Sequence, residues 1–345
     1  MADNLLLIPR LSLSCWCNDN ERNPDVEREQ WRVVLEAVKR AARQVDQAWR
    51  PKRLRFGDWQ IVAMFLWAVA HDRPQSWACD ARHYSGVFRP RRLPSVSQFN
   101  RRMNQPRTRA VLQRVHEALA GGAPAEAMAL TALSYLDGKP LTVGVASKDP
   151  DARRGHVMGG FARGYKLHAW MSEDRRIPIW CVTPLNTHEA PVAEAMVDQV
   201  TTATLPDRSL VLADQNYDAH DLHKRLDARN GRLLVRPKEG GARKARRTAS
   251  SPMVGTRHPV TLRQMGPARR ELLSVVARHP KLFRMVHRQR ANAEGILGNL
   301  CGYGGGLTGL PPWARRMHRV RRWVGGKIIM YHARLRTRTR PAVAA

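Results

Sequence analysis

Acidic residues are scarce in the last third of this chain. The 345 residues include 59 Lys and Arg but only 29 Asp and Glu, which gives a net charge of +30. No acid follows Glu294, and the only other acid after Gly240 is Glu271. Lys and Arg that neutralise phosphates release counterions, so this charge favours a polyanionic partner such as nucleic acid. A carboxylate kept in so basic a region is a candidate metal ligand beside that polyanion.

Cysteines are few, and no pair has zinc-finger spacing apart from the weak Cys15-x-Cys17 pair. We expect all five to be free thiols in a reducing cytoplasm. The longest apolar run, Ile61 to Ala70, has about half of the ~20 residues that a membrane span needs, and it predicts a buried helix. The first residues lack a basic segment followed by an apolar run, so neither a signal peptide nor a membrane partner is expected.

Apolar residues make up 43% of the chain, which is enough for a folded core and excludes a disordered basic tail. The 10 Trp residues argue against a ribosomal or chromatin-type packaging protein. Residues 1 to about 125 predict an all-helical region, because apolar residues recur at helical spacing with charges on the other face. The helices are expected at 31–45, from about residue 58, at 95–103 with a capped start and a basic face, and at 108–120.

From Ala129 the pattern changes to short apolar runs that alternate with helical segments, which predicts a mixed α/β sheet flanked by helices. Residues 130–136 are expected to be a strand that ends at an Asp137-Gly138 turn, with 141–145 as its return. Further strands are expected at 160–170, 177–184, 209–213 and 233–236, and helices at 188–200, 219–229, 271–277 and 285–300. This region, 126–305, is expected to carry a basic insertion near 237–262. A basic tail, 306–345, follows, with a helix at 313–323 and a weaker apolar segment at 328–331.

Three carboxylates stand out, and each has an ordinary structural explanation. Asp137 could be a turn residue. Asp214 follows the most apolar predicted strand and could cap the next helix. Glu294 could pair with Arg290 or His287 on its own helix.

Together, the three carboxylates predict a metal site. Ligands of mixed α/β sheets bind at the carboxyl ends of strands, where Asp137 and Asp214 fall. A late helix packed across the sheet can bring Glu294 to the same place. Convergent carboxylates repel one another unless cations bridge them, and all-oxygen ligands favour Mg²⁺ or Mn²⁺. Two such ions about 4 Å apart would activate a water or a 3′-hydroxyl and stabilise the leaving oxygen of a phosphodiester.

The sequence resembles the DDE transposases of bacterial insertion sequences at four ordered places: Tyr135–Pro140, Gly164–His168, Leu212–Asp218 and Arg290–Glu294. The separations between the acids, 77 and then 80 residues, suit a ribonuclease-H-like catalytic core. The resemblance covers roughly residues 90 to 300. It implies a ribonuclease-H-like mixed sheet, flanked by helices and preceded by the all-helical region.

By that resemblance, Asp137, Asp214 and Glu294 are the catalytic and metal-binding triad, with Glu271 as the alternative third acid. The expected cofactor is Mg²⁺ or Mn²⁺, as two ions. The implied activity is transposition: the protein binds the terminal repeats of a mobile element, hydrolyses the phosphodiester at each end, and joins the freed 3′-hydroxyl to target DNA. Because both ends are cut together, the expected partners are double-stranded DNA and a second copy of the chain, in the bacterial cytoplasm at the nucleoid.

The residues expected to contact DNA lie in two places. Arg101 and Arg102 are on the basic face of the capped helix, in a stretch that resembles the helical region before the core of these enzymes. Around the acids, the resemblance implies that Arg290 faces a phosphate and that Lys166 lies nearby, along with Tyr217 and His168. The N-terminal helices would read bases, and the basic tail would contact phosphates.

The chain departs from the family pattern at two positions. The family often has a Tyr three residues before the Arg and a Lys seven residues after the Glu, and here those positions hold His287 and Cys301. His can replace a phosphate-contacting Tyr, whereas Cys cannot replace a Lys. Both changes bear on DNA handling rather than on the metal ligands. Four basic residues after the first acid could follow a DNA backbone or form a solvated loop: Lys139, Lys148, Arg153 and Arg154.

Two other functions are compatible with the same residues. A site- or structure-specific nuclease would use the same triad without joining, and only a joining assay separates it from a transposase. A DNA-binding protein derived from such an enzyme, with a dead site, would have carboxylates that fail to converge or whose replacement changes nothing.

Overall fold

The computed structural model describes residues 24–49, 54–84, 86, 88–121, 130–200, 205–236, 267–302, 305–307 and 309–339. The predicted basic insertion at 237–262 lies outside these residues, as do Cys15 and Cys17. The cysteines in the described ranges, Cys79, Cys181 and Cys301, are free thiols. None of the helices in these ranges combines the length and the apolar character needed to span a bilayer.

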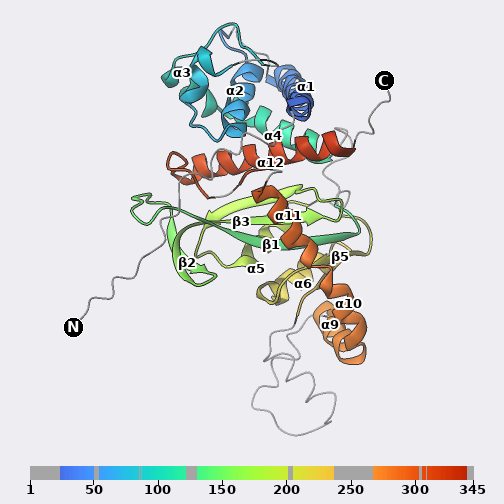
Figure 1. Cartoon of the computed structure of the whole chain (residues 1–345). Coiled ribbons are helices and arrows are strands. Elements are labelled where there is room, and N and C mark those ends of the chain that lie inside the picture. The colour runs from blue at the N-terminus through green and yellow to red at the C-terminus, as the bar shows by residue number, and fades with distance from the viewer. Residues whose placement is uncertain are drawn as a thin grey trace, which may run out of the picture.

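Helices fill the described part of the N-terminal region, as predicted (Figure 1). The long apolar run forms the central helix of this region, in which every side chain from Ile61 to Val69 is buried. Another helix begins at Ser95, whose side chain accepts a hydrogen bond from the Gln98 N–H, while the Gln98 side chain accepts one from the Ser95 N–H. This reciprocal cap explains why its start is legible in the sequence. The helices are α1 Pro24–Trp49, α2 Asp58–Ala70, α3 Val96–Met103 and α4 Pro106–Gly121, with 3₁₀ turns at Trp77–Cys79 and Ala81–His83.

A buried carboxylate ties these helices together. Asp58, at the start of α2, accepts hydrogen bonds from Arg102 (2.7 Å), Arg107 (2.6 Å) and the Thr108 hydroxyl (2.7 Å). Arg107 also pairs with Asp46 of α1. Because a buried charge is costly without its partner, this cluster fixes how α1, α2, α3 and α4 meet.

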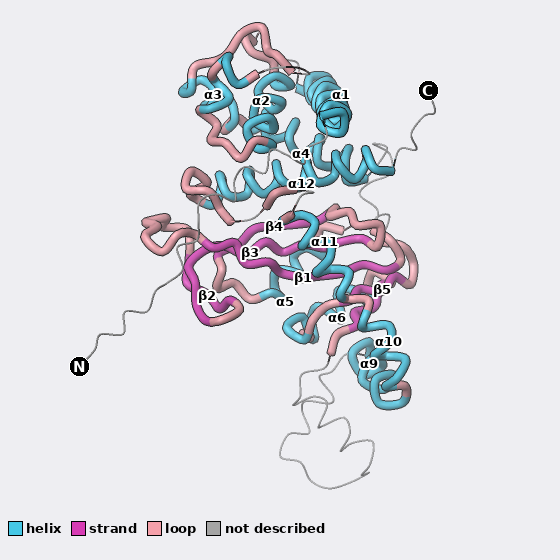
Figure 2. The backbone as a smooth tube through the Cα atoms, viewed as in Figure 1, coloured by secondary structure: helices cyan, strands magenta, loops and turns pink. Residues whose placement is uncertain are grey.

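Six described strands form one mixed sheet in the order β2-β3-β1-β5-β6, with β4 also paired to β3 (Figure 2). Strand β3 runs antiparallel to β1, β2 and β4, whereas β5 and β6 run parallel to β1. This is a ribonuclease-H-like arrangement, and with its flanking helices it confirms the predicted fold class. The strands are β1 Leu133–Thr142, β2 Arg153–Val157, β3 Gly160–Ser172, β4 Ile179–Pro184, β5 Ser209–Leu212 and β6 Gly231–Leu234.

The prediction of a turn at Asp137-Gly138 is wrong. Both residues lie in the middle of β1, which pairs with β3 without interruption from Ser134 to Thr142. Asp137 is opposite Ala169 in this ladder. Pairing along the whole strand outweighs the local turn preference of the Asp-Gly pair.

Each face of the sheet has its own apolar core. On one face, Leu136 and Trp170 pack with side chains of α5 and α6. On the other, Tyr135 and Leu212 pack with side chains of α11 and α12. The helices around the sheet are α5 Glu189–Asp198, α6 His220–Asp227, α9 Pro267–Arg278, α10 Pro280–Arg288, α11 Ala291–Cys301 and α12 Met317–Thr339.

Two further helix predictions need correction. The single helix expected at 285–300 is two helices, α10 and α11, which meet at Gln289 and Arg290, so Glu294 lies in the first turn of α11 and not in mid-helix. The helix at 313–323 and the separate segment at 328–331 are instead one helix, α12. It lies between the N-terminal helices and the sheet (Figure 1), and contacts α1, α2, α4 and β4. Much of this predicted basic tail is therefore buried, with Lys327 only 2% exposed.

Candidate active site

The register of two strands brings Asp137 and Asp214 to the same level of the sheet. Strand β1 pairs in parallel with β5, Leu133 with Leu210 and Tyr135 with Leu212. Asp137 is two residues beyond Tyr135, and Asp214 is two residues beyond Leu212. Side chains two residues apart in a strand share a face. Asp137 therefore lies on the Tyr135 face of the sheet, which α11 covers. Asp214 comes two residues after the end of the neighbouring strand β5.

The electrostatics of the two aspartates show that they lie close together. Burial raises the pKa of Asp137 to about 6; the Gly138 N–H and Arg290 oppose this shift, and the charges of Asp214 and Glu189 add to it. Burial also raises the pKa of Asp214, with a further upward contribution from Glu189. Asp214 caps the 3₁₀ turn Gln215–Tyr217 as well, because its carboxylate accepts the Asn216 N–H at 2.7 Å. The capping role considered for Asp214 and its place beside Asp137 hold at once.

Arg290 lies between Asp137 and Glu294. Its guanidinium is 3.8 Å from an Asp137 oxygen and 2.7 Å from a Glu294 oxygen. The Glu294 side chain is 64% exposed, one turn from Arg290 on α11. In the described parts of the chain, no group of three or more His, Cys, Asp or Glu residues is arranged to hold a metal ion. The geometry therefore places Asp137 near Asp214 and links Glu294 to Asp137 through Arg290.

Two hydrogen bonds fasten the junction of α10 and α11 over the aspartates. The His287 ring, at Nε2, lies 3.2 Å from the carbonyl oxygen of Ala213, the residue before Asp214. On the other side of the junction, the Asn292 side-chain amide donates to the Tyr135 hydroxyl at 3.1 Å. His287 is buried, and burial lowers its pKa. Its contacts are those of a residue that positions Arg290, whereas the sequence predicted a DNA contact.

Lys166 and His168 lie on β3 opposite Pro140 and Gly138, so they point to the other face of the sheet from Asp137. The Lys166 ammonium donates to Glu189 at 3.1 Å. His168 is bonded to the Thr183 hydroxyl at 2.9 Å, and burial lowers the pKa of its imidazole to about 4. Both side chains are engaged within the protein, on the face of the sheet opposite to Asp137.

Glu189 is a site residue that sequence reasoning missed. It opens α5, and its charge raises the pKa of Asp137, Asp214 and Tyr217. A Cβ atom on Gly138 would come within 3.0 Å of the Glu189 carboxylate, so glycine at 138 allows this acid to approach β1. Acidic residues are common in the first turn of a helix because they interact favourably with the helix dipole. Glu189 therefore did not stand out in the sequence as a site residue.

Lys139 and Cys301 meet at the far end of α11. Lys139 is two residues after Asp137 and on the same face of β1. Burial raises the pKa of the Cys301 thiol, and a hydrogen bond from Lys139 opposes that shift. The ammonium group therefore reaches, from β1, the position at which the resembling family often has a lysine on the helix.

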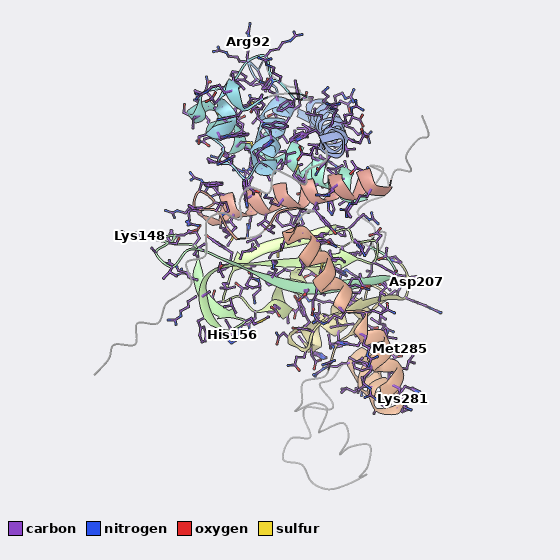
Figure 3. The ribbon with its side chains drawn as sticks, viewed as in Figure 1. Arg92, Lys148, His156, Asp207, Lys281 and Met285 are labelled. Carbon is purple, nitrogen blue, oxygen red and sulfur yellow. The ribbon has the colours of Figure 1, made fainter. Side chains whose placement is uncertain are left out.

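The arginines predicted to bind DNA on α3 differ in their surroundings. Arg101 is exposed. The Arg102 side chain is only 12% exposed and pairs with Asp58, as described above. Other exposed basic residues lie beyond the end of β1: Lys148 follows the strand, and Arg153 and Arg154 are on β2. Lys148 and His156 of β2 mark this end of the sheet in Figure 3.

The donor atoms near Asp137 suit a hard divalent cation. Two close carboxylates, each with a raised pKa, place negative charge where a cation would be stabilised. Their oxygen ligands are those that Mg²⁺ and Mn²⁺ prefer. Glu294 could add a third carboxylate if its side chain left Arg290. Of the ordinary explanations considered, only the Asp137 turn is excluded by the structure.

Three comparisons with known proteins were made, and one of them shows the family of this chain. Residues 133–308, just over half of the chain, match the family described as "Transposase DDE domain". A search of curated proteins finds no match. Among solved structures, the chain is similar to one titled "Cryo-EM structure of piggyBac transposase synaptic complex with hairpin DNA", with 11% sequence identity and a TM-score of 0.44 over 94% of this chain and 78% of that one. The family match spans the sheet and both aspartates, and the chain belongs to the DDE-domain transposases.

Proposed function

We propose that this transposase binds the ends of a mobile DNA element, cuts the phosphodiester at each end, and joins the freed 3′-hydroxyl to target DNA. The observation that carries this proposal is the placement of Asp137 and Asp214 at one level of adjacent parallel strands. With the family match over residues 133–308, that placement supports a catalytic rather than a purely DNA-binding protein.

Asp137, Asp214 and Glu294 would hold the divalent ions, with Mg²⁺ or Mn²⁺ as the cofactor. When bound, such ions supply Lewis-acid chemistry to a phosphodiester, which activates the attacking oxygen and stabilises the leaving one. The protein's part is to hold the two aspartates close together in a buried place. Glu189 and burial work against ionisation, so cation binding would relieve a repulsion that the fold maintains.

Arg290 would change partners when the site is loaded. Without a cation it neutralises Asp137 and Glu294. A cation between the carboxylates would repel the guanidinium, which would then be free to pair with a DNA phosphate, a bidentate acceptor that suits arginine. His287 and Asn292 would hold the α10–α11 junction in place during this exchange.

DNA contact would come from several exposed basic residues. We place base reading in the N-terminal region, residues 1–125, with Arg101 as the contact on α3. Lys139 would contact a phosphate beside the active site, and Lys148, Arg153 and Arg154 would follow the backbone past the end of β1. Arg102, Lys166 and His287 would act by supporting the fold around these contacts. Because two ends must be cut together, we expect a homodimer assembled on DNA, in the bacterial cytoplasm at the nucleoid.

The test is a cleavage and joining assay with donor DNA that includes the sequences flanking the gene on both sides. Wild-type protein is compared with Asp137→Asn, Asp214→Asn and Glu294→Gln in Mg²⁺ or Mn²⁺. The control is Glu271→Gln, which removes the alternative third acid, an exposed carboxylate on α9. DNA binding is measured for every variant, so that loss of chemistry is separated from loss of binding.

The possible results separate three functions. Joined product from wild type and from Glu271→Gln, absent in the other three variants, would support the proposal. Metal-dependent cleavage without joining would indicate a nuclease. DNA binding without cleavage by any protein would indicate a derivative with a dead site. Loss of activity in Glu271→Gln with retention in Glu294→Gln would move the third ligand to Glu271.

A further inference from the structure

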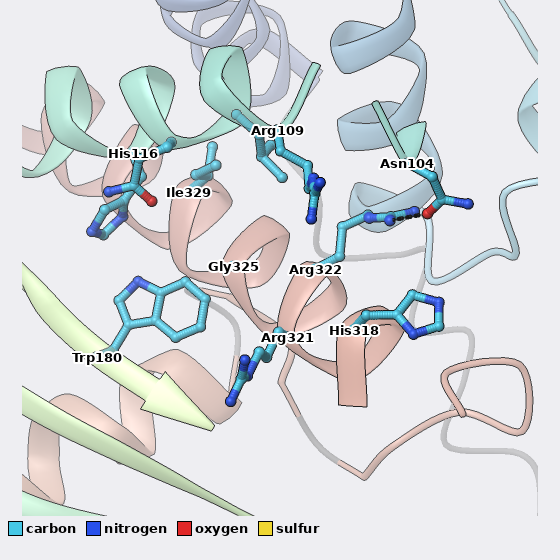
Figure 4. A pocket seen from close by; sticks show the side chains of 11 residues that line it. Asn104, Arg109, His116, Trp180, His318, Arg321, Arg322, Gly325 and Ile329 are labelled. Carbon is cyan, nitrogen blue, oxygen red and sulfur yellow. Dashed lines mark hydrogen bonds between the residues drawn. The ribbon is translucent and has the colours of Figure 1, made fainter. Parts of the chain in front are cut away.

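A pocket of about 510 Å³ lies between α4, α12 and β4, away from the acids (Figure 4). A second pocket of about 490 Å³ adjoins it, and both are lined by Trp180 and Arg321. Figure 4 shows Arg109, Arg321, Arg322 and His318 around the first pocket, with the Trp180 indole at one side. Among the described residues that line it, none is acidic.

Arg322 gives this pocket a buried positive charge. The residue is only 9% exposed, and its guanidinium donates to the Asn104 side-chain oxygen at 2.6 Å. Asn104 is neutral, so this bond satisfies a donor without balancing the charge. Burial, together with the charges of Arg109 and Arg319, lowers the pKa of Arg322 to about 10. A buried cation among other cations is unfavourable unless an anion joins it.

Two acids whose charges act on residues of the pocket lining, Asp151 on His318 and Glu117 on His116, have other partners. Asp151 accepts the Met317 N–H at 2.9 Å, at the start of α12. Glu117 of α4 pairs with Arg114 at 3.2 Å. These carboxylates hold the surrounding structure and do not line the pocket. Arg109 and Arg321 are exposed at its mouth, where they would meet a ligand that enters from solvent.

The position of the pocket relates it to the active site. Trp180 on β4 is opposite Ala169 on β3, and Ala169 is opposite Asp137 on β1. Residues paired across a sheet point to the same face, and neighbouring strands are about 4.8 Å apart. The backbone at Trp180 is therefore on the order of 10 Å from that at Asp137, along one row of the sheet. A nucleic acid bound at the aspartates would have other phosphates at about this distance, and therefore near the pocket.

We propose that this arginine pocket is a second phosphate-binding site, with Arg322 as its buried anchor and Arg109 and Arg321 as the groups that capture the ligand. The pocket is large enough for a nucleotide unit, and the partly buried Trp180 ring in its wall is an aromatic group on which a base can stack. The phosphate belongs to DNA held at the active site, an assignment that rests on the proposed function. A free phosphate or nucleotide has the same chemistry and is distinguished by the test.

The test uses full-length protein with Arg109→Ala and Arg321→Ala together, two exposed residues whose loss leaves the core intact. Arg322→Met is the second variant. The control, Arg270→Ala with Arg284→Ala, removes the same charge from exposed positions on α9 and α10. The first measurement is the affinity for duplex DNA carrying an element end across a range of KCl concentrations. The second is the melting temperature without DNA, in inorganic phosphate or in a nucleoside monophosphate, each against KCl of equal ionic strength.

Each phosphate contact contributes about 0.9 to the slope of log affinity against log salt concentration. We expect the slope of the Arg109/Arg321 variant to be smaller in magnitude than that of the control by about 0.9, which corresponds to the loss of about one phosphate contact. Phosphate is expected to raise the melting temperature of wild type and control but not of the two pocket variants.

A changed slope supports the DNA assignment. If phosphate no longer raises the melting temperature of the pocket variants but their salt slope equals that of the control, the pocket binds a free phosphate or nucleotide. That result refutes the DNA assignment. No difference between pocket variants and control in either measurement overturns the proposal. If wild type binds no DNA at all, the proposed function fails, while the melting experiment still decides whether the pocket binds phosphate.

Discussion

Arg290 should compete with the metal ions for the carboxylates, and its replacement should make metal binding tighter. In Arg290→Gln the guanidinium that lies 3.8 Å from Asp137 and 2.7 Å from Glu294 is gone. The glutamine retains polar atoms but no charge. A divalent cation then enters a site of two or three carboxylates without displacing an internal cation.

The size of the effect follows from the charge separation. Two unit charges 4 Å apart attract by about 4 kcal/mol at an effective dielectric constant of about 20. The Asp137 and Arg290 side chains are 17% and 22% exposed, so solvent and salt reduce this attraction. A net competition of about 1–2 kcal/mol corresponds to Mn²⁺ affinity higher by about 5- to 30-fold.

The assay is calorimetric titration of DNA-free protein with Mn²⁺ at a pH of about 8, where Asp137, with a pKa of about 6, is ionised. The matched control is Arg288→Gln, which removes an exposed charge at the end of α10. DNA cleavage by Arg290→Gln should fall even though its metal affinity rises, because the proposed phosphate contact is lost. Equal Mn²⁺ affinity in wild type, Arg290→Gln and Arg288→Gln would refute the reasoning, as would weaker binding in Arg290→Gln alone.

Three further predictions concern other parts of the fold. Asp58→Ala should lower the free energy of unfolding by about 3–5 kcal/mol, because the largely buried Arg102 loses its carboxylate and Arg107 keeps only Asp46; denaturant titration measures this, and a near-neutral result would contradict it. Lys139→Ala should weaken DNA cleavage, and adding Cys301→Lys should restore it, because the ammonium returns to the same place from the helix; failure of that rescue would count against a phosphate contact there. Burial holds the pKa of His332 well below its ordinary value near 6.5. Since the unfolded chain then binds the proton more readily, stability is full above about pH 6.5 and declines as the pH falls below it. The melting temperature should fall less on acidification in His332→Gln, and an equal fall in both proteins would contradict this.

The sequence predicts elements whose causes are local. The reciprocal cap of Ser95 and Gln98 marks the start of α3, and the apolar run from Ile61 marks a buried helix. The sequence also brought Asp137 and Asp214 together, by placing each at the end of one of two neighbouring strands. The strands are neighbours, but Asp137 lies within β1 and not at its end. Glu294 was brought to the same place by the expectation that a late helix packs across the sheet, and the family resemblance gave it the role of third acid.

The corrected elements depend on contacts that are distant in sequence. Strand β1 continues through Asp137 because β3 pairs with it along its whole length. The helix predicted at 285–300 breaks without a proline or glycine at the junction, where His287 and Asn292 are bonded to other elements of the fold. Neither of those partners is visible from local sequence.

The full length and the burial of α12 were missed because the segment is rich in arginine. Its arginines predicted a surface tail, whereas Val320, Val324 and Ile328 form a buried stripe at helical spacing that could have been recognised. The predicted helix ended at residue 323 and a separate segment began at 328, yet Gly325 between them lies within α12. A Cβ atom there would come within 3.0 Å of the Trp180 ring, so the glycine allows close packing against β4.

The central claim is that Asp137, Asp214 and Glu294 form one metal site when DNA is bound. Anomalous X-ray scattering from Mn²⁺, in crystals of the protein with its end DNA, tests this most directly. The account predicts manganese peaks between the carboxylates of Asp137 and Asp214, with Glu294 turned toward them and Arg290 released from Asp137. Manganese bound elsewhere, or none between these aspartates with DNA in place, would contradict it.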